Sequence, residues 1–165
     1  MYDFKPAAAD PAELYRGLLG AADALTAGEP DAVANMANVA ALLWEFLPDL
    51  NWAGFYRVAS TKDGGANELV LGPFVGRPAC IRIPFGKGVC GAAAESRAAQ
   101  LVADVHAFPG HIACDAASQS ELVVPVLRGG EVIAVIDLDS PSPARFTEAD
   151  ADGITALATL LSDRI

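Results

Sequence analysis

The sequence predicts an α+β domain in which helices pack on one face of an antiparallel sheet of about six strands. Apolar residues recur at helical spacing near both ends of the chain, whereas β-rich runs fill the middle. Most of these runs are joined by short turns, and short connections place consecutive strands side by side in opposite directions. Together these patterns are typical of helices layered on an antiparallel sheet.

The predicted helices begin at residues that suit helix N-termini. Asp10 is an N-cap candidate with Pro11 at the first helical position, and Asp31 can cap the second helix. Gly28-Glu29-Pro30 separates these two helices. Thr147 opens a further N-cap signature before the closing helix. The apolar stripes of the first two helices are assigned to the core, with no chemistry.

Six β-rich runs between these helices are predicted to form the sheet. A glycine-bearing turn marks a hairpin between the first two runs, and Arg128-Gly129-Gly130 joins the last two. A short helix is expected from Val89 to Arg97, and a long loop, which is usually functional in a compact domain, precedes residue 120. The runs span residues 52–58, 68–75, 79–83, 100–102, 120–127 and 131–138.

Composition and charge narrow the class of protein. The 165 residues are 53% hydrophobic and 19% charged, which predicts one globular domain over residues 1–165, with 1–9 as an N-terminal extension. The net charge of −10 disfavours binding to nucleic acid and to anionic membranes. The N-terminus has no apolar core of a signal peptide, and no segment is long and apolar enough to span a bilayer. We therefore expect a soluble, cytoplasmic protein with free or catalytic thiols.

One stretch, from His106 to Glu121, concentrates chemistry that a core does not need. Its sixteen positions hold two histidines, a cysteine, two acids and several small polar residues. Cys80 and Cys90 precede it. We interpret Cys114, inside this stretch, as a reactive thiol in an acid-lined pocket that the rest of the fold positions.

Two other interpretations of the cysteines stay open on the residues alone. All three can be buried side chains that act as small hydrophobes. Alternatively, they can bind zinc, although the spacing lacks the closely paired cysteines of common zinc sites. The candidate zinc ligands are Cys80, Cys90, Cys114, His106 and His111.

Three acids are singled out as pocket residues. Asp137 and Asp139 are two positions apart on a strand and so share a face, and the apolar run 132–136 before them indicates a buried strand. A charged residue at the end of a buried strand is costly unless its charge is paired or functional. In general, however, acidic residues in strands are more often simply solvated. If Glu121 joins them, crowding should raise at least one pKa, because neighbouring carboxylates resist ionising together.

The turn at residues 128–130 decides whether Glu121 shares a face with the acidic pair. A two-residue turn at Gly129-Gly130 would point Glu121 away from the pair. A three-residue loop would place Glu121 opposite Asp137. We predict the three-residue loop, or a bulge that restores the same parity.

Five segments of the sequence together match one known family. They are Asn51-Trp52-Ala53-Gly54-Phe55-Tyr56, Leu71-Gly72-Pro73-Phe74, Arg82-Ile83-Pro84 through Gly88-Val89-Cys90-Gly91, Asp104-Val105-His106 through Glu121, and Ile136-Asp137-Leu138-Asp139-Ser140 with Arg145-Phe146-Thr147. These segments resemble those of the free methionine-(R)-sulfoxide reductases, which are enzymes with the GAF fold. The likeness covers nearly the whole chain, and the stretch from His106 to Glu121 is its most specific part, whereas the hairpin 124–140 alone would indicate only a GAF domain. The glycine-bearing turn at 61–66 looks longer than usual.

The resemblance implies reduction of free L-methionine-(R)-sulfoxide by thiol chemistry. It implies Cys114 as the catalytic thiol, Cys80 as the main resolving thiol and Cys90 as the alternative resolver. Attack on the sulfoxide would leave Cys114 as a sulfenic acid, which a second thiol converts to a disulfide. Thioredoxin is the implied external reductant, with no bound cofactor and no metal. We also expect a homodimer.

The resemblance further implies that Glu121, Asp137 and Asp139 line the substrate pocket. A protonated carboxyl would donate to the sulfoxide oxygen, and an ionised one would hold the substrate's ammonium group. Trp52 and Tyr56 are candidates for the pocket wall, where an aromatic face suits a methyl-sulfur group, or else they are ordinary strand core. The histidines are interpreted as hydrogen-bonding loop residues.

Two other classes of function compete with the reductase. A GAF domain can act as a sensor that binds a small metabolite without catalysis. The chain can also be a structural dimer module with incidental cysteines. An attached output domain would favour the sensor, and the sequence contains none.

Overall fold

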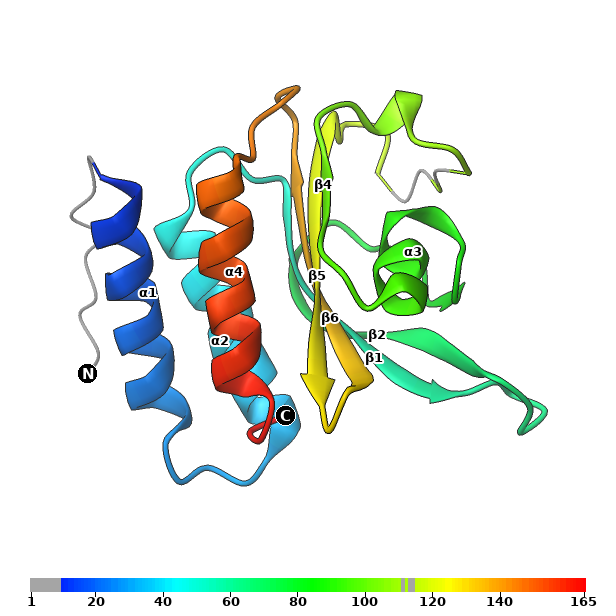
Figure 1. Cartoon of the computed structure of the whole chain (residues 1–165), viewed down its shortest axis with the longest axis horizontal. Helices are drawn as coiled ribbons and strands as arrows, with labels where there is room; N and C mark the ends of the chain where they lie inside the picture. The colour runs from blue at the N-terminus through cyan, green and yellow to red at the C-terminus, as the bar shows by residue number, and fades with distance from the viewer. Residues whose placement is uncertain (1–9, 111, 113–114) are drawn as a thin grey trace.

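The protein is a six-stranded antiparallel sheet with helices on both faces (Figure 1). The computed structural model describes residues 10–110, 112 and 115–165. The strand order across the sheet is β3-β2-β1-β6-β5-β4, and every neighbouring pair is antiparallel. The elements are α1 (Pro11–Thr26), α2 (Ala32–Phe46), β1 (Trp52–Ser60), β2 (Asn67–Gly76), β3 (Arg82–Pro84), α3 (Gly88–Ser96), β4 (Gln100–Val102), a short 3-10 helix η1 (Val105–Ala107), β5 (Ser120–Arg128), β6 (Glu131–Ser140) and α4 (Glu148–Leu161).

The three long helices begin where the sequence predicts. Asp10 Oδ1 accepts from the backbone N–H of Ala12, and Asp31 Oδ1 accepts from that of Ala34. At the start of α4, Asp150 Oδ2 accepts from both the backbone N–H and the hydroxyl of Thr147. These side chains satisfy backbone donors that a helix N-terminus leaves unpaired.

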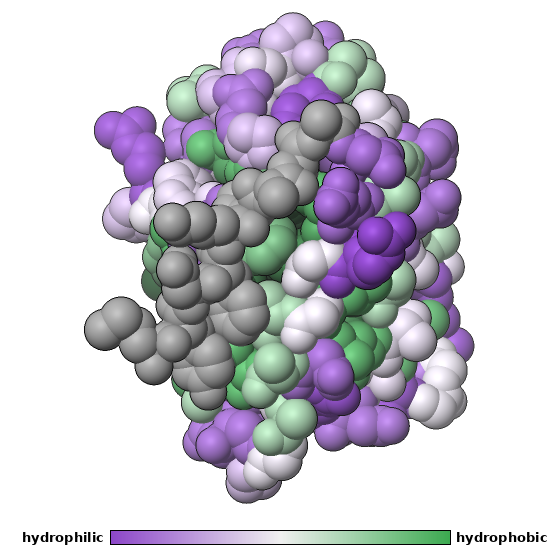
Figure 2. Space-filling model, turned by 90° about the vertical axis from the view of Figure 1, so that its left-hand side faces the viewer, coloured by the Kyte–Doolittle hydropathy of each residue, from purple (hydrophilic) through white to green (hydrophobic). Residues whose placement is uncertain are grey.

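The long helices pack on one face of the sheet, as predicted, and form the larger core with it (Figure 1). Helices α1 and α4 approach so closely that a Cβ at Gly153 would lie 2.3 Å from the ring of Tyr15, so only glycine fits there. Figure 2 views the molecule from this helical side, where hydrophobic and hydrophilic residues are interspersed. Within the described part of the chain, no helix is both long and apolar enough to cross a membrane.

The short helix α3 lies on the opposite face, so helices are not confined to one side (Figure 1). It forms a second, smaller core with inward residues of β1, β5 and β6, among them Tyr56, Val123 and Val135. A Cβ at Gly91 would lie 2.5 Å from the carbonyl oxygen of Pro84, which shows how tightly α3 sits on the end of β3. This second face carries the candidate site.

The β5–β6 hairpin confirms the second of the two predicted alternatives, a bulge that restores the parity. Arg128 pairs with Glu131, so the turn has two residues and the three-residue loop is not formed. The bulge lies between Val126 and Leu127 and shifts the register by one residue. Glu121 therefore pairs with Asp139 rather than with Asp137, but both aspartates share its face.

The third predicted strand is shorter than the run 79–83 suggested. Only Arg82–Pro84 pairs with β2 as a strand. The chain just before it is held differently, because the carbonyl oxygen of Cys80 accepts a hydrogen bond from the Tyr56 hydroxyl at 3.0 Å. This hydrogen bond ties the segment before β3 to the side chain of a β1 residue.

Candidate functional site

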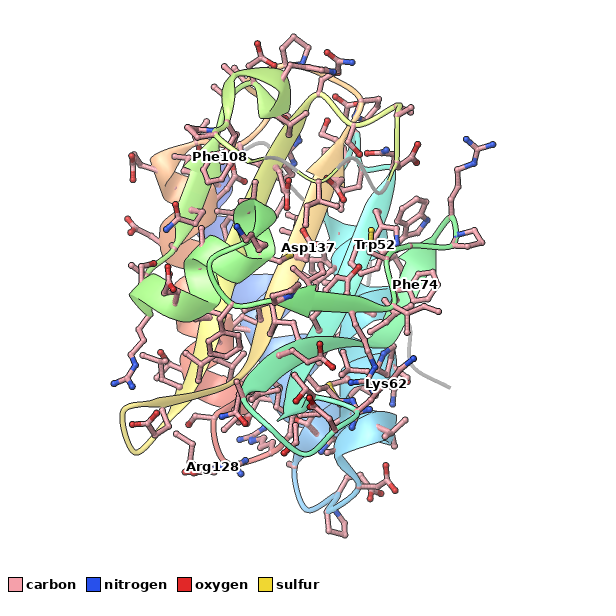
Figure 3. The ribbon with its side chains drawn as sticks, turned by 90° about the vertical axis from the view of Figure 1, so that its right-hand side faces the viewer. Trp52, Lys62, Phe74, Phe108, Arg128 and Asp137 are labelled. Carbon is pink, nitrogen blue, oxygen red and sulfur yellow. The ribbon has the colours of Figure 1, made fainter. Side chains whose placement is uncertain are left out.

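A cavity opens between the sheet and α3, on the face away from the long helices. Its walls come from β1, β3, α3, β5 and β6 and from the segment before β5. Figure 3 views the molecule from this side, with Asp137 on β6 at its centre. The described lining residues are Tyr56, Ile83, Lys87, Gly88, Val89, Cys90, Ile112, Asp115, Ser118, Glu121, Asp137 and Asp139.

The three predicted acids meet in this cavity. Glu121 and Asp137 are buried, with 7% and 6% of their surfaces exposed, and Asp139 is half-buried. Burial raises the pKa of all three carboxyl groups, and for Glu121 and Asp139 the charge of Asp137 raises it further. The pKa of Asp137 is raised to about 7, where hydrogen bonds with Cys90 and Glu121 limit the rise. The site is therefore able to hold a proton near neutral pH.

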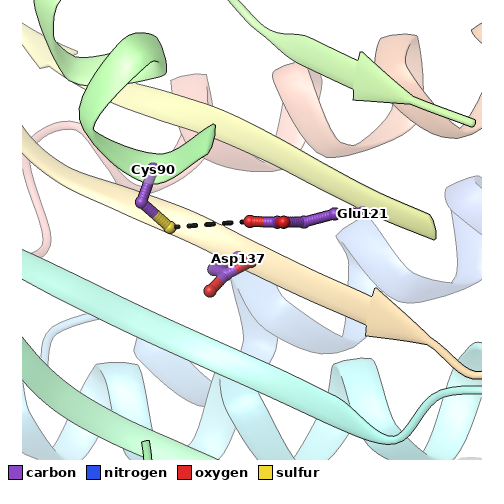
Figure 4. Close-up of side chains that lie close together, drawn as sticks. All are labelled: Cys90, Glu121 and Asp137. Carbon is purple, nitrogen blue, oxygen red and sulfur yellow. Dashed lines mark hydrogen bonds between the residues drawn. The ribbon is translucent and has the colours of Figure 1, made fainter. Parts of the chain in front are cut away.

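Cys90 belongs to the same cluster. Its position at the start of α3 directs the thiol over the sheet, where Sγ lies 4.0 Å from Oε1 of Glu121 (Figure 4). The side chain is buried, and it is a free thiol. Burial raises the pKa of this thiol well above its usual value, and the charges of Asp137 and Glu121 raise it further. Cys90 is therefore held as a neutral thiol rather than as a nucleophilic thiolate.

Of the other two cysteines, Cys80 is among the described residues and Cys114 is not. Cys80 precedes β3 and is disulfide-bonded. Cys114 and His111 lie outside the described residues. Their neighbours Ile112 and Asp115 both line the cavity, so the chain on either side of Cys114 borders the acid cluster.

The two aromatic candidates lie at different depths. Tyr56 lines the cavity and donates its hydroxyl to the backbone of Cys80. Trp52 is not among the lining residues; its ring stacks on Tyr56 at 5.8 Å and on Phe74 at 5.1 Å between centroids. Its indole N–H donates to the carbonyl oxygen of Arg77 at 3.1 Å. Figure 3 shows Trp52 and Phe74 side by side at the edge of this face.

Comparisons with known proteins agree with this arrangement. A family model for the GAF domain matches residues 8–165. The chain is 48% identical to the free methionine-R-sulfoxide reductase of Escherichia coli, over 90% of this chain and 87% of that protein. The chain belongs to the free methionine-(R)-sulfoxide reductase family of GAF domains.

Other relatives extend over almost the full length of this GAF protein. Protein YtsP of Bacillus subtilis is 49% identical over 98% of this chain and 96% of its own. The crystal structure of the free methionine-R-sulfoxide reductase from Neisseria meningitidis, in complex with its substrate, superposes with a TM-score of 0.91. It is 45% identical and covers 99% of this chain and 95% of that one. The α+β GAF fold predicted from the sequence is thereby confirmed.

Several polar residues of the candidate site escaped the sequence prediction. Asn51, just before β1, donates through Nδ2 to Oγ of Ser118 at 3.0 Å and to Oδ2 of Asp115 at 3.3 Å. Its backbone N–H donates to the carbonyl oxygen of Asp139 at 3.0 Å. Ser118 in turn forms a hydrogen bond with the carboxyl of Asp139, which lowers the pKa of that group against the effect of burial. Asn51 opens the segment that matched the family, which was the one available signal.

Lys87 is the one cationic residue among the described cavity-lining residues. Lys87 is the N-cap residue of α3. It lies in the segment 82–91 that resembles the reductase family, but the sequence analysis assigned no role to it. His106, by contrast, behaves as predicted, because its Nδ1 lies 3.0 Å from Oδ1 of Asp104 at the start of η1. Neither Asp104 nor His106 is among the residues that line the cavity.

Proposed function

We propose that this chain reduces free L-methionine-(R)-sulfoxide to L-methionine, using its cysteines as the electron source. The proposal rests on one observation, which is that Glu121, Asp137 and Asp139 converge in a single cavity. Membership of the reductase family supports it. In the overall reaction one sulfoxide and two thiols give one thioether, one disulfide and one water.

The carboxyl cluster suits both tasks of the site, which are binding the substrate and donating a proton to it. An ionised carboxylate binds the ammonium group of a free amino acid. A protonated carboxyl donates to the sulfoxide oxygen as the S–O bond breaks. Because burial raises all three pKa values, the cluster holds at least one proton near neutral pH while retaining charge elsewhere. Peptide-bound methionine sulfoxide lacks the free ammonium group and is excluded for that reason.

Cys114 is the nucleophile in this proposal. Its thiolate attacks the sulfoxide sulfur, the oxygen takes a proton from the cluster, and methionine leaves as Cys114 becomes a sulfenic acid. The thiol of Cys80 then displaces water from the sulfenic acid and forms a disulfide. Thioredoxin restores both thiols by disulfide exchange.

Cys80 is assigned the resolving role in preference to Cys90. Cys80 is disulfide-bonded, whereas Cys90 is a buried free thiol. Burial and the neighbouring carboxyls raise the pKa of Cys90 and so suppress the thiolate that resolution requires. Cys90 is assigned instead to the wall of the substrate pocket.

The aromatic and basic residues complete the pocket. Tyr56 lines it directly, and Trp52 supports Tyr56 from behind through ring stacking. An aromatic wall suits the methyl-sulfur group of the substrate. Lys87 offers a positive charge to the substrate carboxylate. The enzyme is further proposed to work in the cytoplasm, as a homodimer and without a bound cofactor.

The carboxyl groups also create a difficulty for the nucleophile. Negative charge beside a thiol raises its pKa and lowers the thiolate fraction, so carboxylates in this pocket would oppose ionisation of Cys114. Transfer of the Cys114 proton to the cluster when substrate binds resolves this difficulty. Single-turnover rates should then depend on pH with an ionisation near neutrality, and a flat profile across that range would count against the transfer.

The deciding experiment is a thioredoxin-coupled assay with free methionine-R-sulfoxide. The S epimer and a peptide-bound sulfoxide are run beside it, and wild type is compared with Cys114→Ser and Cys80→Ser. We expect turnover of the free R form only, none with Cys114→Ser, and one turnover per chain with Cys80→Ser. If freshly reduced wild type shows no turnover but binds the amino acid, the protein is a metabolite sensor instead.

A further inference from the structure

We propose that Cys90, Glu121 and Asp137 form a binding site for a thiophilic divalent cation of the Zn²⁺ class. The three residues come from α3, β5 and β6, and each offers one ligand atom. These atoms all lie within 4.8 Å of one another, and all three side chains are buried (Figure 4). This set shares only Cys90 with the zinc ligands that the sequence suggested.

The spacing of the three atoms fits tetrahedral coordination. Zinc bonds to sulfur at about 2.3 Å and to carboxylate oxygen at about 2.1 Å, which places a sulfur and an oxygen ligand ~3.6 Å apart. Sγ of Cys90 and Oε1 of Glu121 are 4.0 Å apart without any rearrangement. The other two pairs of ligand atoms lie within 4.8 Å of one another, so side-chain movements of up to about 1 Å would complete the geometry.

An unpaired oxygen provides a second, independent indication of a missing ligand. Oδ1 of Asp137 is inaccessible to solvent, and no described residue pairs with this particular oxygen, so the hydrogen bonds of the Asp137 carboxyl with Cys90 and Glu121 leave Oδ1 without a partner. Asp137 as a whole is only 6% exposed. A buried carboxylate oxygen without a partner is costly, and proteins usually pair such an atom with a donor or a cation.

The donor set selects the kind of cation. As it binds, the cation displaces the proton of the Cys90 thiol and any carboxyl proton to solvent. The resulting thiolate and two carboxylates suit borderline metals such as Zn²⁺, Co²⁺ and Cd²⁺, whereas Mg²⁺ and Ca²⁺ require oxygen ligands in larger number. The three ligands also line the cavity, so a fourth ligand can approach the cation from it. Three protein ligands and one open position are typical of accessible rather than purely structural zinc sites.

The cation would occupy the space assigned above to the substrate. Two of its ligands, Glu121 and Asp137, are the carboxyls proposed to bind the ammonium group and donate the proton. Cation binding itself is independent of the proposed function, but its competition with methionine sulfoxide rests on that function. Zinc would then hold the reduced enzyme inactive until substrate or a chelator displaced it.

Titration of the metal-free full chain with Co²⁺ tests the site directly. Co²⁺ bound to a thiolate gives a sulfur-to-metal charge-transfer absorption in the near ultraviolet, and a tetrahedral site intensifies its visible bands. Wild type, Cys90→Ser, Asp137→Asn and Cys114→Ser are compared in their reduced forms, with His106→Gln as the control for adventitious binding. Circular dichroism checks that each variant is folded.

We expect one equivalent of Co²⁺ to produce both absorptions in wild type, Cys114→Ser and His106→Gln. Cys90→Ser should lose the charge-transfer band, and Asp137→Asn should weaken Co²⁺ binding at least tenfold. Absence of the band in wild type, or its loss in Cys114→Ser instead of Cys90→Ser, would overturn the proposal. Equal affinity in wild type and Asp137→Asn would do so as well.

Competition separates this proposal from the proposed function. Free methionine-R-sulfoxide should reduce Co²⁺ binding to wild type, and Zn²⁺ should slow single-turnover reduction of the sulfoxide in the absence of added thiols. If Co²⁺ binds as expected but no sulfoxide is reduced, the metal site stands and the reductase function fails. If sulfoxide is reduced but wild type gives no charge-transfer band, the reductase function stands and the metal site fails.

Discussion

Glu121 on β5 lies directly opposite Asp139 on β6. Like charges in such a cross-strand pair destabilise a sheet, and Asp137 adds a third carboxyl to the same face. The pKa of each of these groups is raised by burial, so the repulsion is relieved by protonation. Three buried carboxyl groups on one face of a sheet do not stabilise the fold. Changes to these groups should therefore alter the free energy of unfolding as well as the activity.

The first prediction concerns the dependence of stability on pH. Asp137 has a pKa of about 7 in the folded protein against 3.8 for an ordinary aspartate. Between these values the folded state keeps a proton that the unfolded chain has released, so the free energy of unfolding falls as pH rises through this range. At about 1.4 kcal/mol per pKa unit, this group alone accounts for up to about 4 kcal/mol.

Asp137→Asn removes that titration and should flatten the dependence. Urea unfolding at pH 5 and pH 8 should show a clear loss of stability in wild type and a smaller one in the variant, in which Glu121 and Asp139 still titrate. Asp152→Asn, at an exposed position on α4, is the matched control and should keep the wild-type slope. Parallel slopes for wild type and Asp137→Asn would contradict the assigned pKa.

The second prediction separates two buried tyrosine hydroxyls. Tyr56→Phe removes the hydrogen bond to the carbonyl oxygen of Cys80, and Tyr15→Phe removes the one to Asp150 at 2.6 Å. Each change should lower the free energy of unfolding by about 1–3 kcal/mol. Only Tyr56→Phe should also lower kcat with thioredoxin, because it loosens the backbone of the proposed resolving cysteine. Equal kcat values in the two variants would argue against that coupling.

The third prediction tests how closely α3 must sit on the sheet. Gly91→Ala would place a Cβ 2.5 Å from the carbonyl oxygen of Pro84, so α3 must shift and carry Cys90 with it. We expect a loss of about 1–3 kcal/mol in stability and reduced turnover. Gly20→Ala, in α1 with no atom within 4 Å of the new Cβ, is the control. It should raise stability by about 0.5–1 kcal/mol and leave turnover unchanged.

The fourth prediction assigns Asn51 a positioning role. Asn51→Ala removes the side-chain hydrogen bonds to Ser118 and Asp115 that hold the segment before β5 against β1. Ser118 should then position Asp139 less well, so KM should rise about tenfold while kcat changes less. Asn67→Ala, at the exposed start of β2, should leave both values unchanged. A fall in kcat at constant KM would point to a role for Asn51 in the chemical step instead.

Local patterns in the sequence were enough to predict most of the elements and the three acids of the candidate site. Helix caps and strand alternation depend on neighbouring residues, so Asp10, Asp31 and Thr147 mark helix starts in the structure as they do in the sequence. The same holds for the acids. A charged pair after the buried run 132–136 identified Asp137 and Asp139 as unusual before any contact was known.

Contacts between distant segments were decided only by the tertiary structure. The bulge at Val126 and Leu127 sets which acid faces Glu121, and no local pattern distinguishes it from a longer turn. The placement of α3 on the second face decides that Cys90 is a buried neutral thiol beside two carboxyls. Asn51 and Ser118 meet across 67 positions of sequence. The burial and the pKa of a side chain depend on all of its neighbours in space, and the local sequence pattern does not specify those neighbours.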